Sequence, residues 1–412
     1  MSRILILGDL AATGFGTVTM DLGRALIERG EEVRFCPLND QNPGDLPEPF
    51  ASRARLLGHE EGWYREPEPE QVPAMVEMMR SVFLAWPDGW TPEATILIGD
   101  VASLKMSLFP DLIPKGLPAF NYCPIEGIGL SPRWILAWAN MKPVAMSEFG
   151  ADQIATIYPE RPPVIYHGVD TEAFYPVSRD RPIVFTDPNG VLTVLRSKED
   201  CKRHFGRDPN RTLLLSTNAN VRRKMYASLF RSLAPVLANH PELDLIFHCQ
   251  IIDYGGDLLD EVSKYGQLGL RMIPSGFREK GRSIDRKQLN ALYNAADLYV
   301  GAGGEGFGLT YAEALACGVP ALGIDFSSVP EIIGPAGMCV PIGALIDSEF
   351  SCFWARPNEV EYTKAAEFLV SHQMRRRELG RLGPAHVAAN FSWARAASEF
   401  AALIPSRIEV AA

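Results

Sequence analysis

The feature that most constrains the fold is a strand, turn, helix and strand pattern that occurs in both halves of the chain. Residues 3–8 form an isoleucine and leucine run without alternation, which predicts a buried parallel strand. A glycine-containing turn follows, then apolar residues at helical spacing over 17–29, and an extended pattern at 33–35. This order predicts an α/β domain with a doubly wound sheet at the N-terminus.

The same pattern begins again near residue 210. Further strands are expected at 212–216, 243–248, 271–273, 298–301 and 321–324, and further helices at 225–239 and 286–296. A length of 412 residues exceeds the usual size of one core. A polar, proline-containing stretch follows Pro176, so we expect two domains, residues 1–176 and 177–390, both of them Rossmann-like.

Composition narrows the classes of function. A net charge of −10 argues against a mainly electrostatic nucleic-acid binder. The seven cysteines are scattered, with no Cys-x-x-Cys pair and no histidine cluster at zinc spacing, which favours free thiols in a reducing compartment. No apolar run is long enough for a signal peptide or a membrane span, so a cytoplasmic location is expected.

A glycine-rich segment at residues 304–320 carries two carboxylates eight positions apart. Glu305 lies in the glycine-rich loop, and Glu313 lies about one turn into a helix that is expected to begin at Leu309. The free N–H groups and the positive dipole end of such a helix favour a phosphate. One carboxylate can accept from sugar hydroxyls and the other from a ribose, so the segment suits a sugar nucleotide.

A basic segment follows the strand expected at 212–216. Arg222, Arg223 and Lys224 precede a helix, which places them at the carboxyl edge of the sheet, where α/β proteins bind ligands. Cations oppose the dipole at a helix N-terminus, so phosphate neutralisation is favoured over a solvated helix start. A second basic segment, residues 276–282, is either a border of the same crevice or a solvated loop.

The first half offers weaker candidates. Gly14 and Gly16 do not complete the dinucleotide fingerprint, and they form either a tight structural turn or a loop that lets backbone approach a ligand. Glu126 follows the strand expected at 119–122, and it is either a carboxylate near the acceptor or the reacting sugar, or a residue of a turn. His167 is interpreted as structural.

Several segments occur together in an order that is typical of one family. They are residues 147–150, 167–170, 289–300, 305–309, 313–314, 316–320, 330–331 and 391–393. In this order they resemble the retaining glycosyltransferases of family 4, the group 1 glycosyl transferases with the GT-B architecture. The resemblance covers most of the chain and is strongest in the second half.

The resemblance implies two Rossmann-like domains that face each other across a cleft, with residues 391–412 forming a helix that packs back on the first domain. It assigns Glu305 to the transferred sugar and Glu313 to the ribose, and Lys224 to the diphosphate. The usual arginine partner of this lysine would fall at Ala219, so Arg222 or Arg223 must substitute. The backbone of Gly306, Phe307, Gly308, Leu309 and Thr310 would contact the sugar and the diphosphate.

These observations predict a metal-independent, retaining transferase that moves a hexose from a nucleotide-diphosphate sugar to an unidentified hydroxyl. Glu305, Lys224, Arg223 and Glu126 are the expected catalytic residues, and Glu126 stands where many members of the family have a histidine. No Asp-x-Asp sequence occurs, so no metal and no cofactor are expected. The acceptor is a glycan, a lipid-linked sugar or a small molecule, and peripheral membrane association stays open.

Three alternatives remain at this point. A transferase that acts on modified DNA bases would need a basic, aromatic cleft in the first domain. An epimerase of the same fold would rearrange the donor alone. A binding module that recognises sugar nucleotides without turnover would neither hydrolyse nor transfer the donor.

Overall fold

The computed structural model describes residues 1–11, 13–37, 46–55, 86–100, 113–186, 190–275 and 284–405. The chain divides into two compact units. Unit 1 comprises residues 1–168, 349–352 and 391–412, and unit 2 comprises residues 169–348 and 353–390. The second basic segment, 276–282, lies outside the described residues.

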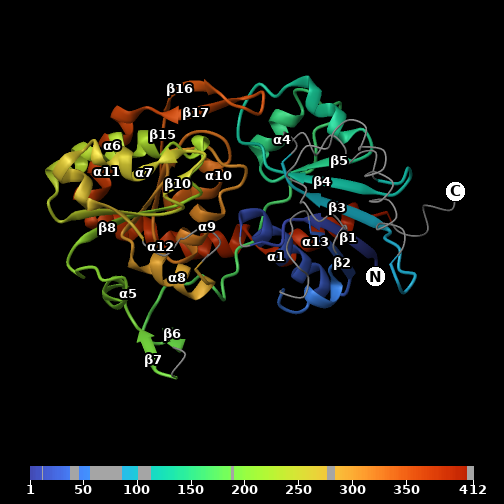
Figure 1. Cartoon of the computed structure of the whole chain (residues 1–412), viewed down its shortest axis with the longest axis horizontal. Helices are drawn as coiled ribbons and strands as arrows, with labels where there is room; N and C mark the ends of the chain where they lie inside the picture. The colour runs from blue at the N-terminus through green and yellow to red at the C-terminus, as the bar shows by residue number, and fades with distance from the viewer. Residues whose placement is uncertain are drawn as a thin grey trace. The chain divides into compact units, whose positions relative to one another are not determined.

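Unit 1 is built on a parallel sheet with strand order β2-β1-β3-β4-β5 (Figure 1). Its described elements are β1 (Arg3–Gly8), α1 (Gly14–Glu28), β2 (Glu32–Pro37), η2 (Ala51–Arg53), β3 (Ala94–Ile98), β4 (Ala119–Cys123), η4 (Pro132–Trp138), β5 (Lys142–Ala145), α4 (Glu148–Ile154) and α13 (Trp393–Leu403). Strands β3 and β4 are buried along their whole length, as expected for a parallel sheet that is covered by helices.

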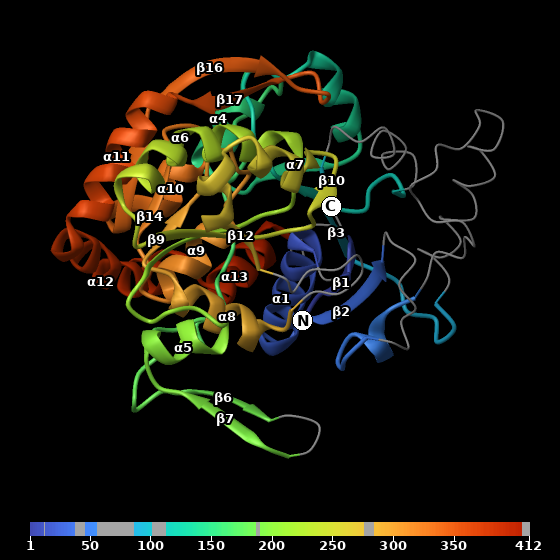
Figure 2. The ribbon, with the colours of Figure 1, turned by 60° about the vertical axis from the view of Figure 1, so that its left-hand side comes forward.

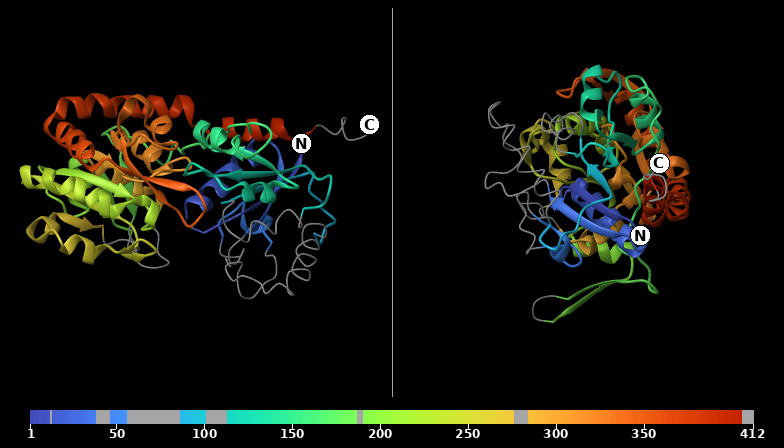
Figure 3. Two further views of the ribbon diagram at one scale, coloured as in Figure 1. Left: turned by 90° about the horizontal axis from the view of Figure 1, so that it is seen from above. Right: turned by 90° about the vertical axis from the view of Figure 1, so that its right-hand side faces the viewer.

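Helices α1 and α13 pack on each other and on this sheet (Figure 3). The ring of Phe400 on α13 meets Tyr122 on β4 edge to face, with the centroids 4.9 Å apart. A glycine is required at position 23 of α1, because a Cβ there would lie 2.5 Å from the ring of Phe35 on β2. The C-terminal helix is therefore an integral layer of unit 1.

Unit 2 is built on a second parallel sheet, with strand order β12-β9-β8-β13-β14-β15. The elements that form it are β8 (Thr212–Thr217), η5 (Arg222–Lys224), α6 (Tyr226–Asn239), β9 (Leu243–His248), α7 (Leu258–Ser263), η6 (Gly266–Arg271), β12 (Met272–Pro274), α8 (Arg286–Ala295), β13 (Leu298–Val300), α9 (Leu309–Ala316), β14 (Ala321–Ile324), α10 (Val329–Ile333), η7 (Gly334–Ala336), β15 (Gly337–Val340), α11 (Glu359–Ser371) and α12 (Gln373–Asn390). Helices α6 and α11 pack together on one face, and α8 and α9 lie on the other (Figure 1).

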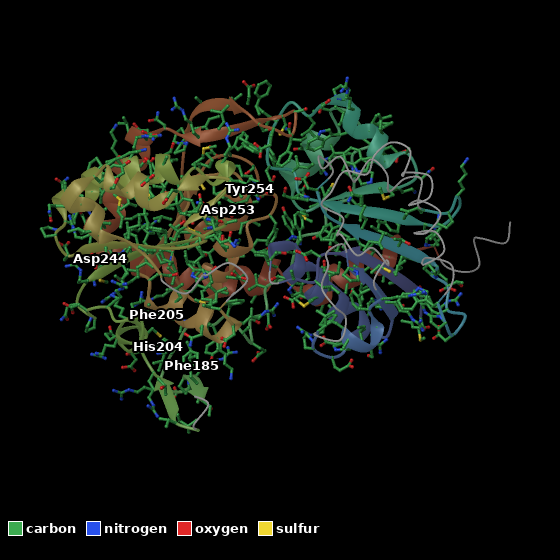
Figure 4. All side chains as sticks on the ribbon, viewed as in Figure 1. Phe185, His204, Phe205, Asp244, Asp253 and Tyr254 are labelled. Carbon is green, nitrogen blue, oxygen red and sulfur yellow. The ribbon has the colours of Figure 1, made fainter. Side chains whose placement is uncertain are left out.

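Antiparallel strand pairs complete unit 2. They are β6 (Ile183–Thr186) with β7 (Leu192–Leu195), β10 (Ile252–Asp253) with β11 (Gly256–Asp257), and β16 (Ile342–Asp347) with β17 (Phe353–Pro357). The β6–β7 pair projects beyond α5 (Lys198–His204), as Figure 2 shows. Phe185 on β6 stacks on His204 of α5 at a centroid distance of 4.9 Å (Figure 4), which ties the hairpin to the helix.

The observed elements follow the expected pattern, with shifts at two places. Helix α1 begins at Gly14 rather than at residue 17, because the Thr13 side chain caps it by accepting from the Gly16 amide at 3.0 Å. The first segment of unit 1 ends at Gly168, eight residues before the domain boundary that was expected at residue 176. The amides of Tyr175 and Val177 donate to Asn290 and Asn294 on α8, and these bonds attach the connecting segment to unit 2.

Each unit is thus a doubly wound, Rossmann-like α/β sheet, as the sequence predicted. Among the described residues, no helix has both the length and the hydropathy that crossing a bilayer requires. The seven cysteines are all free thiols, and six of them are buried.

Candidate functional site

The centre of the candidate site is a buried ion pair between Lys224 and Glu305 in unit 2. The ammonium of Lys224 donates to Oε1 of Glu305, and Arg223 Nη1 lies 3.4 Å from Oε2 of the same carboxylate. Lys224 and Glu305 are only 8% and 7% exposed. Two cations thus share this carboxylate, and a cluster of this kind suits an incoming anion.

The sheet topology brings these residues together. The η5 turn follows β8, and the Glu305 loop follows β13, which lies next to β8 in the sheet. Both loops therefore leave the carboxyl ends of neighbouring parallel strands, the usual place for a ligand in a doubly wound sheet. Gly303 permits their close approach, because a Cβ there would lie 2.0 Å from the carbonyl oxygen of Arg223.

Two serines hold the Glu305 loop from behind. The amide of Glu305 donates to Ser327 Oγ at 2.8 Å. Ser328 Oγ donates to the carbonyls of Glu305 and Phe307 at 2.8 and 2.6 Å. Neither serine was expected from the sequence, because nothing in the segment after β14 marks it as a partner of Glu305, which lies 22 residues before Ser327.

Backbone strain gathers at this site. Met225 and Ser327 both have positive φ, 54° and 56°, and they are two of the three non-glycine residues with that property in the described parts of the chain. One immediately follows Lys224, and the other accepts the Glu305 amide. Such conformations cost about 1–3 kcal/mol each and persist only where the surroundings hold them, and they often cluster at binding sites.

Helix α9 begins directly after the glycine-rich loop. Its N-cap is Gly308, with φ at 107°, and no side chain caps the first turn. Gly306, Phe307 and Gly308 are buried, and Leu309 and Thr310 are half-buried. Thr310 Oγ1 accepts from Tyr299 OH at 2.7 Å, which fixes the side chain at the helix start. Uncapped first-turn amides are well suited to bind an anion.

Glu313 lies further along α9, where it is 8% exposed. The Tyr293 hydroxyl on α8 donates to its Oε2 at 2.7 Å. Burial, and then the charge of Glu313, raise the pKa of Tyr293 well above its usual range, so the phenol stays a donor. Tyr293 lies in the 289–300 segment, but the sequence gives no sign of its role, because the carboxylate that it contacts is 20 residues away.

The two candidate arginines occupy different surroundings. Arg223 joins Lys224 at Glu305 and also donates to the carbonyl of Gly304 at 3.1 Å. Arg222 is exposed and lines a hollow of about 460 Å³ together with Arg231, Asp260 and Lys264. Of the two substitutes for the missing arginine, Arg223 is therefore the one that shares a carboxylate with Lys224.

The remaining predicted site residues belong to unit 1. Gly14 and Gly16 are in the first turn of α1 and not in a loop, since Thr13 already caps the helix. Gly16 has a packing reason to be glycine, because a Cβ there would lie 1.8 Å from the Ala11 carbonyl oxygen, whereas Gly14 has open space around it. Glu126 is half-buried just beyond β4. Donor or catalytic roles for these three residues stay predictions.

His167 is a core residue, as its sequence context predicted. It is 3% exposed, hydrogen-bonds Tyr122 at 2.7 Å through Nδ1, and stacks on Trp393. Burial lowers its pKa to about 3, so the ring is neutral in the folded protein. The next residue, Gly168, has to be a glycine, because a Cβ there would lie 2.2 Å from the Trp393 backbone nitrogen.

Comparison with known proteins supports the interpretation of unit 2. Residues 197–351 match the family model described as "Glycosyl transferases group 1". A GDP-mannose-dependent monoacylated alpha-(1-6)-phosphatidylinositol monomannoside mannosyltransferase from Corynebacterium glutamicum is 25% identical over 210 residues, 48% of each chain. The chain thus matches about half the length of this curated relative.

Solved structures resemble the whole chain. Sucrose-phosphate synthase from Thermosynechococcus elongatus aligns with a TM-score of 0.73 and 17% identity over 98% of both chains. Anabaena HepE in complex with UDP and glucose aligns with a TM-score of 0.66 and 15% identity, over 98% of this chain and 99% of the other. The fold is therefore the GT-B architecture of two Rossmann-like domains, and the stretch that matches the family model, residues 197–351, includes η5, Glu305 and Glu313.

Proposed function

We propose that this protein is a retaining hexosyltransferase that uses a nucleotide-diphosphate hexose as donor and needs no metal ion. The observation that carries the proposal is the buried cluster of Arg223, Lys224 and Glu305 beside the uncapped start of α9. All of these groups, and Glu313, lie within the stretch that matches the glycosyltransferase family model.

In the proposed reaction the bond between the anomeric carbon and the diphosphate breaks, and negative charge develops on the leaving phosphate. Lys224, Arg223 and the first-turn amides of α9 stabilise that charge. Preorganised groups of this kind often make the largest contribution to catalysis, because they need no reorganisation when the charge appears. The site supplies the positive charge that a metal ion supplies in other transferases.

The two carboxylates take different parts of the donor. Glu305, in the loop, accepts hydrogen bonds from hydroxyls of the transferred sugar. Glu313, held by Tyr293, accepts from the ribose hydroxyls. Glu305 therefore acts near the reacting carbon, and Glu313 acts mainly on donor affinity.

The acceptor hydroxyl attacks from the face that the leaving diphosphate vacates. Its proton passes to a phosphate oxygen on that face, so the new bond keeps the anomeric configuration of the donor. The transition state resembles an oxocarbenium ion, and no protein nucleophile is needed. Glu126 and the first turn of α1, at Gly14 and Gly16, are the proposed contributions of unit 1.

A thermal-shift screen tests the donor site. GDP-mannose, UDP-glucose, an ADP-hexose and a TDP-hexose are each added to the full chain, since a ligand that binds only the folded state raises Tm. GDP-mannose and UDP-glucose come first, because the mannosyltransferase relative is GDP-mannose-dependent and the HepE structure holds UDP and glucose. A shift with one base and not with the others supports the proposal, whereas no shift with any donor contradicts it.

A transfer assay then separates the alternatives. The donor found in the screen is incubated with glycolipid, glycan and small-molecule acceptors, and NMR of the product reports the anomeric configuration. A product with inverted anomeric configuration would contradict the proposal that the enzyme is retaining. Activity that is lost in EDTA and restored by a divalent cation would contradict the proposal that it needs no metal ion. Rearrangement of the donor without any acceptor would indicate an epimerase. Transfer to modified DNA would indicate a DNA-directed transferase, and donor binding without turnover would indicate a binding module.

A further inference from the structure

A second hollow lies at the opposite edge of the unit 2 sheet from the candidate site. Thr212, Asp297 and Pro320 line it, and these residues directly precede or begin strands β8, β13 and β14. Glu305 and η5 instead follow the ends of β13 and β8. The hollow has a volume of about 850 Å³, within the range of small-molecule sites.

Cationic side chains dominate this hollow in a chain whose net charge is −10. Its charged lining consists of six cations and two carboxylates: Lys198, Lys202, Arg211, Arg376, Arg377, Arg381, Glu199 and Asp297. One face of α12 supplies three of the arginines, at positions 376, 377 and 381.

Some of this charge is used within the protein. Asp297 pairs with Lys202 at 2.8 Å and with Lys198 at 3.2 Å. Arg211 pairs with Asp244, which does not line the hollow. Each cation on the β8 and α5 side therefore has a carboxylate partner, with Lys198 and Lys202 sharing Asp297, whereas the arginines of α12 that line the hollow form no ion pair among the described residues.

Arg376 is the most deeply placed of these arginines, at 5% exposed. Its Nη1 donates to the carbonyls of Leu369 and Val370 near the end of α11, and no described residue accepts from its Nε or Nη2. Burial lowers the pKa of Arg376, and the charge of Asp297 offsets this only in part, which means that the guanidinium charge is held in place at an energetic cost. A guanidinium with unused donors in a buried wall is well suited to an anionic ligand.

Arg377 and Arg381 complete the wall. Both are exposed, and neither forms an ion pair with a carboxylate in the described part of the chain. Arg375, on the same helix, does not line the hollow and pairs with Glu378 at 2.7 Å. The arginines without an ion pair thus face the hollow, and a neighbour that does not face it is neutralised.

We propose that this hollow is a second binding site, separate from the donor site, for a small soluble phosphate ester. Its phosphate binds Arg376, Arg377 and Arg381 on α12, because guanidinium groups match phosphate oxygens with paired, charge-assisted hydrogen bonds. The volume leaves room for the rest of a molecule the size of a sugar phosphate.

The test is calorimetric titration of the full chain with glucose 6-phosphate, with inorganic phosphate as the minimal probe. Saturating GDP or UDP is present throughout, so that the diphosphate site is filled. The double variant R377Q/R381Q should bind glucose 6-phosphate at least about tenfold more weakly, since one charge-assisted bond is worth about 1.4 kcal/mol or more. Arg376 is left intact, because its bonds to the end of α11 contribute to folding.

Arg375→Gln is the control on the same helix; it removes one positive charge, whereas the double variant removes two. It should bind glucose 6-phosphate like the wild type, and its Tm and that of R377Q/R381Q should stay near the wild-type value. Equal weakening by R375Q would indicate general electrostatics and overturn the proposal. Unchanged binding by R377Q/R381Q, or no binding of glucose 6-phosphate to the wild type while GDP or UDP is saturating, would overturn it too.

Vesicles that contain phosphatidic acid form the last arm. Vesicle binding that R377Q/R381Q abolishes, without any binding of soluble phosphate esters, would assign the hollow to a membrane headgroup and contradict the proposed ligand. These measurements do not depend on transferase activity, so they stand even if no donor is found.

Discussion

Tyr293 on α8 donates its hydroxyl to the carboxylate of Glu313 on α9 at 2.7 Å, inside unit 2. Both side chains are at least nine-tenths buried, and Tyr293 OH also lies 2.9 Å from Thr217 Oγ1 at the end of β8. The bond therefore joins two helices and the carboxyl end of a central strand. It orients the carboxylate that we assign to the ribose.

Replacing Tyr293 with phenylalanine should reduce the free energy of unfolding by about 1.5–3 kcal/mol, because a hydrogen bond to a charged, buried group is lost. The donor KM should rise as well, since Glu313 loses its fixed orientation. Urea unfolding and initial-rate kinetics measure the two effects. Tyr122→Phe in unit 1 is the control: its hydroxyl bonds the Ile165 carbonyl and His167, so stability should fall while the donor KM stays unchanged.

Removing the charge of Glu305 and removing the charge of Glu313 should affect different kinetic constants. Glu305→Gln keeps the shape of the side chain but removes the charge that pairs with Lys224, and it should lower kcat by about 10²-fold or more, the scale of losing one preorganised catalytic group. Glu313→Gln should chiefly raise the donor KM. Steady-state kinetics at a series of donor concentrations distinguish the two variants. A raised donor KM in Glu305→Gln together with a lowered kcat in Glu313→Gln would contradict the proposed roles.

The two glycines at the start of α1 should differ in stability. Gly16→Ala places a Cβ 1.8 Å from the Ala11 carbonyl oxygen and should destabilise unit 1 by about 1–3 kcal/mol or more. Gly14→Ala meets nothing within 4 Å and should be neutral or stabilise by up to about 1 kcal/mol. Urea unfolding tests this pair. A change in donor KM in the stable Gly14→Ala variant would support a ligand contact at that position.

His167 should make unit 1 sensitive to acid. Burial lowers its pKa to about 3, whereas an unfolded histidine titrates near 6.5. The folded protein therefore resists protonation, and the stabilisation that is present above pH ~6.5 is lost as the pH falls toward 3, by up to about 1.4 kcal/mol per pH unit. The difference in unfolding free energy between wild type and His167→Gln should shrink between pH 7 and pH 5.

His240 provides a control of opposite sign. Burial is the largest single influence and lowers its pKa, but the hydrogen bonds to Glu367 and Glu242, together with the charges of these carboxylates, raise the pKa overall. Its contribution is therefore complete below the unfolded pKa and is lost as the pH rises through the folded pKa. The difference between wild type and His240→Gln should grow as the pH falls. If the stability difference changed with pH in the same direction for both histidines, the buried, uncharged surroundings of His167 or the carboxylate partners of His240 would be contradicted.

The sequence by itself determined the elements and the chemistry of the candidate site. Uninterrupted apolar runs and 3.6-residue spacing are local properties, so the parallel strands and most helices could be predicted from short windows. The order of β8 before η5, and of β13 before the Glu305 loop, was enough to place both motifs at the carboxyl edge of a sheet. Composition likewise narrowed the classes of function before any geometry was known.

Only the tertiary structure decided which groups meet. Strand order places β8 next to β13, and this neighbourhood, which no local pattern encodes, lets Arg223 rather than Arg222 share Glu305 with Lys224. Tyr293, Ser327 and Ser328 act through contacts that span 20 residues or more, and the arginines of α12 gain a common hollow only through packing on the β strands. Such contacts depend on three-dimensional packing, because burial and hydrogen bonding are satisfied across the whole core and not along the chain.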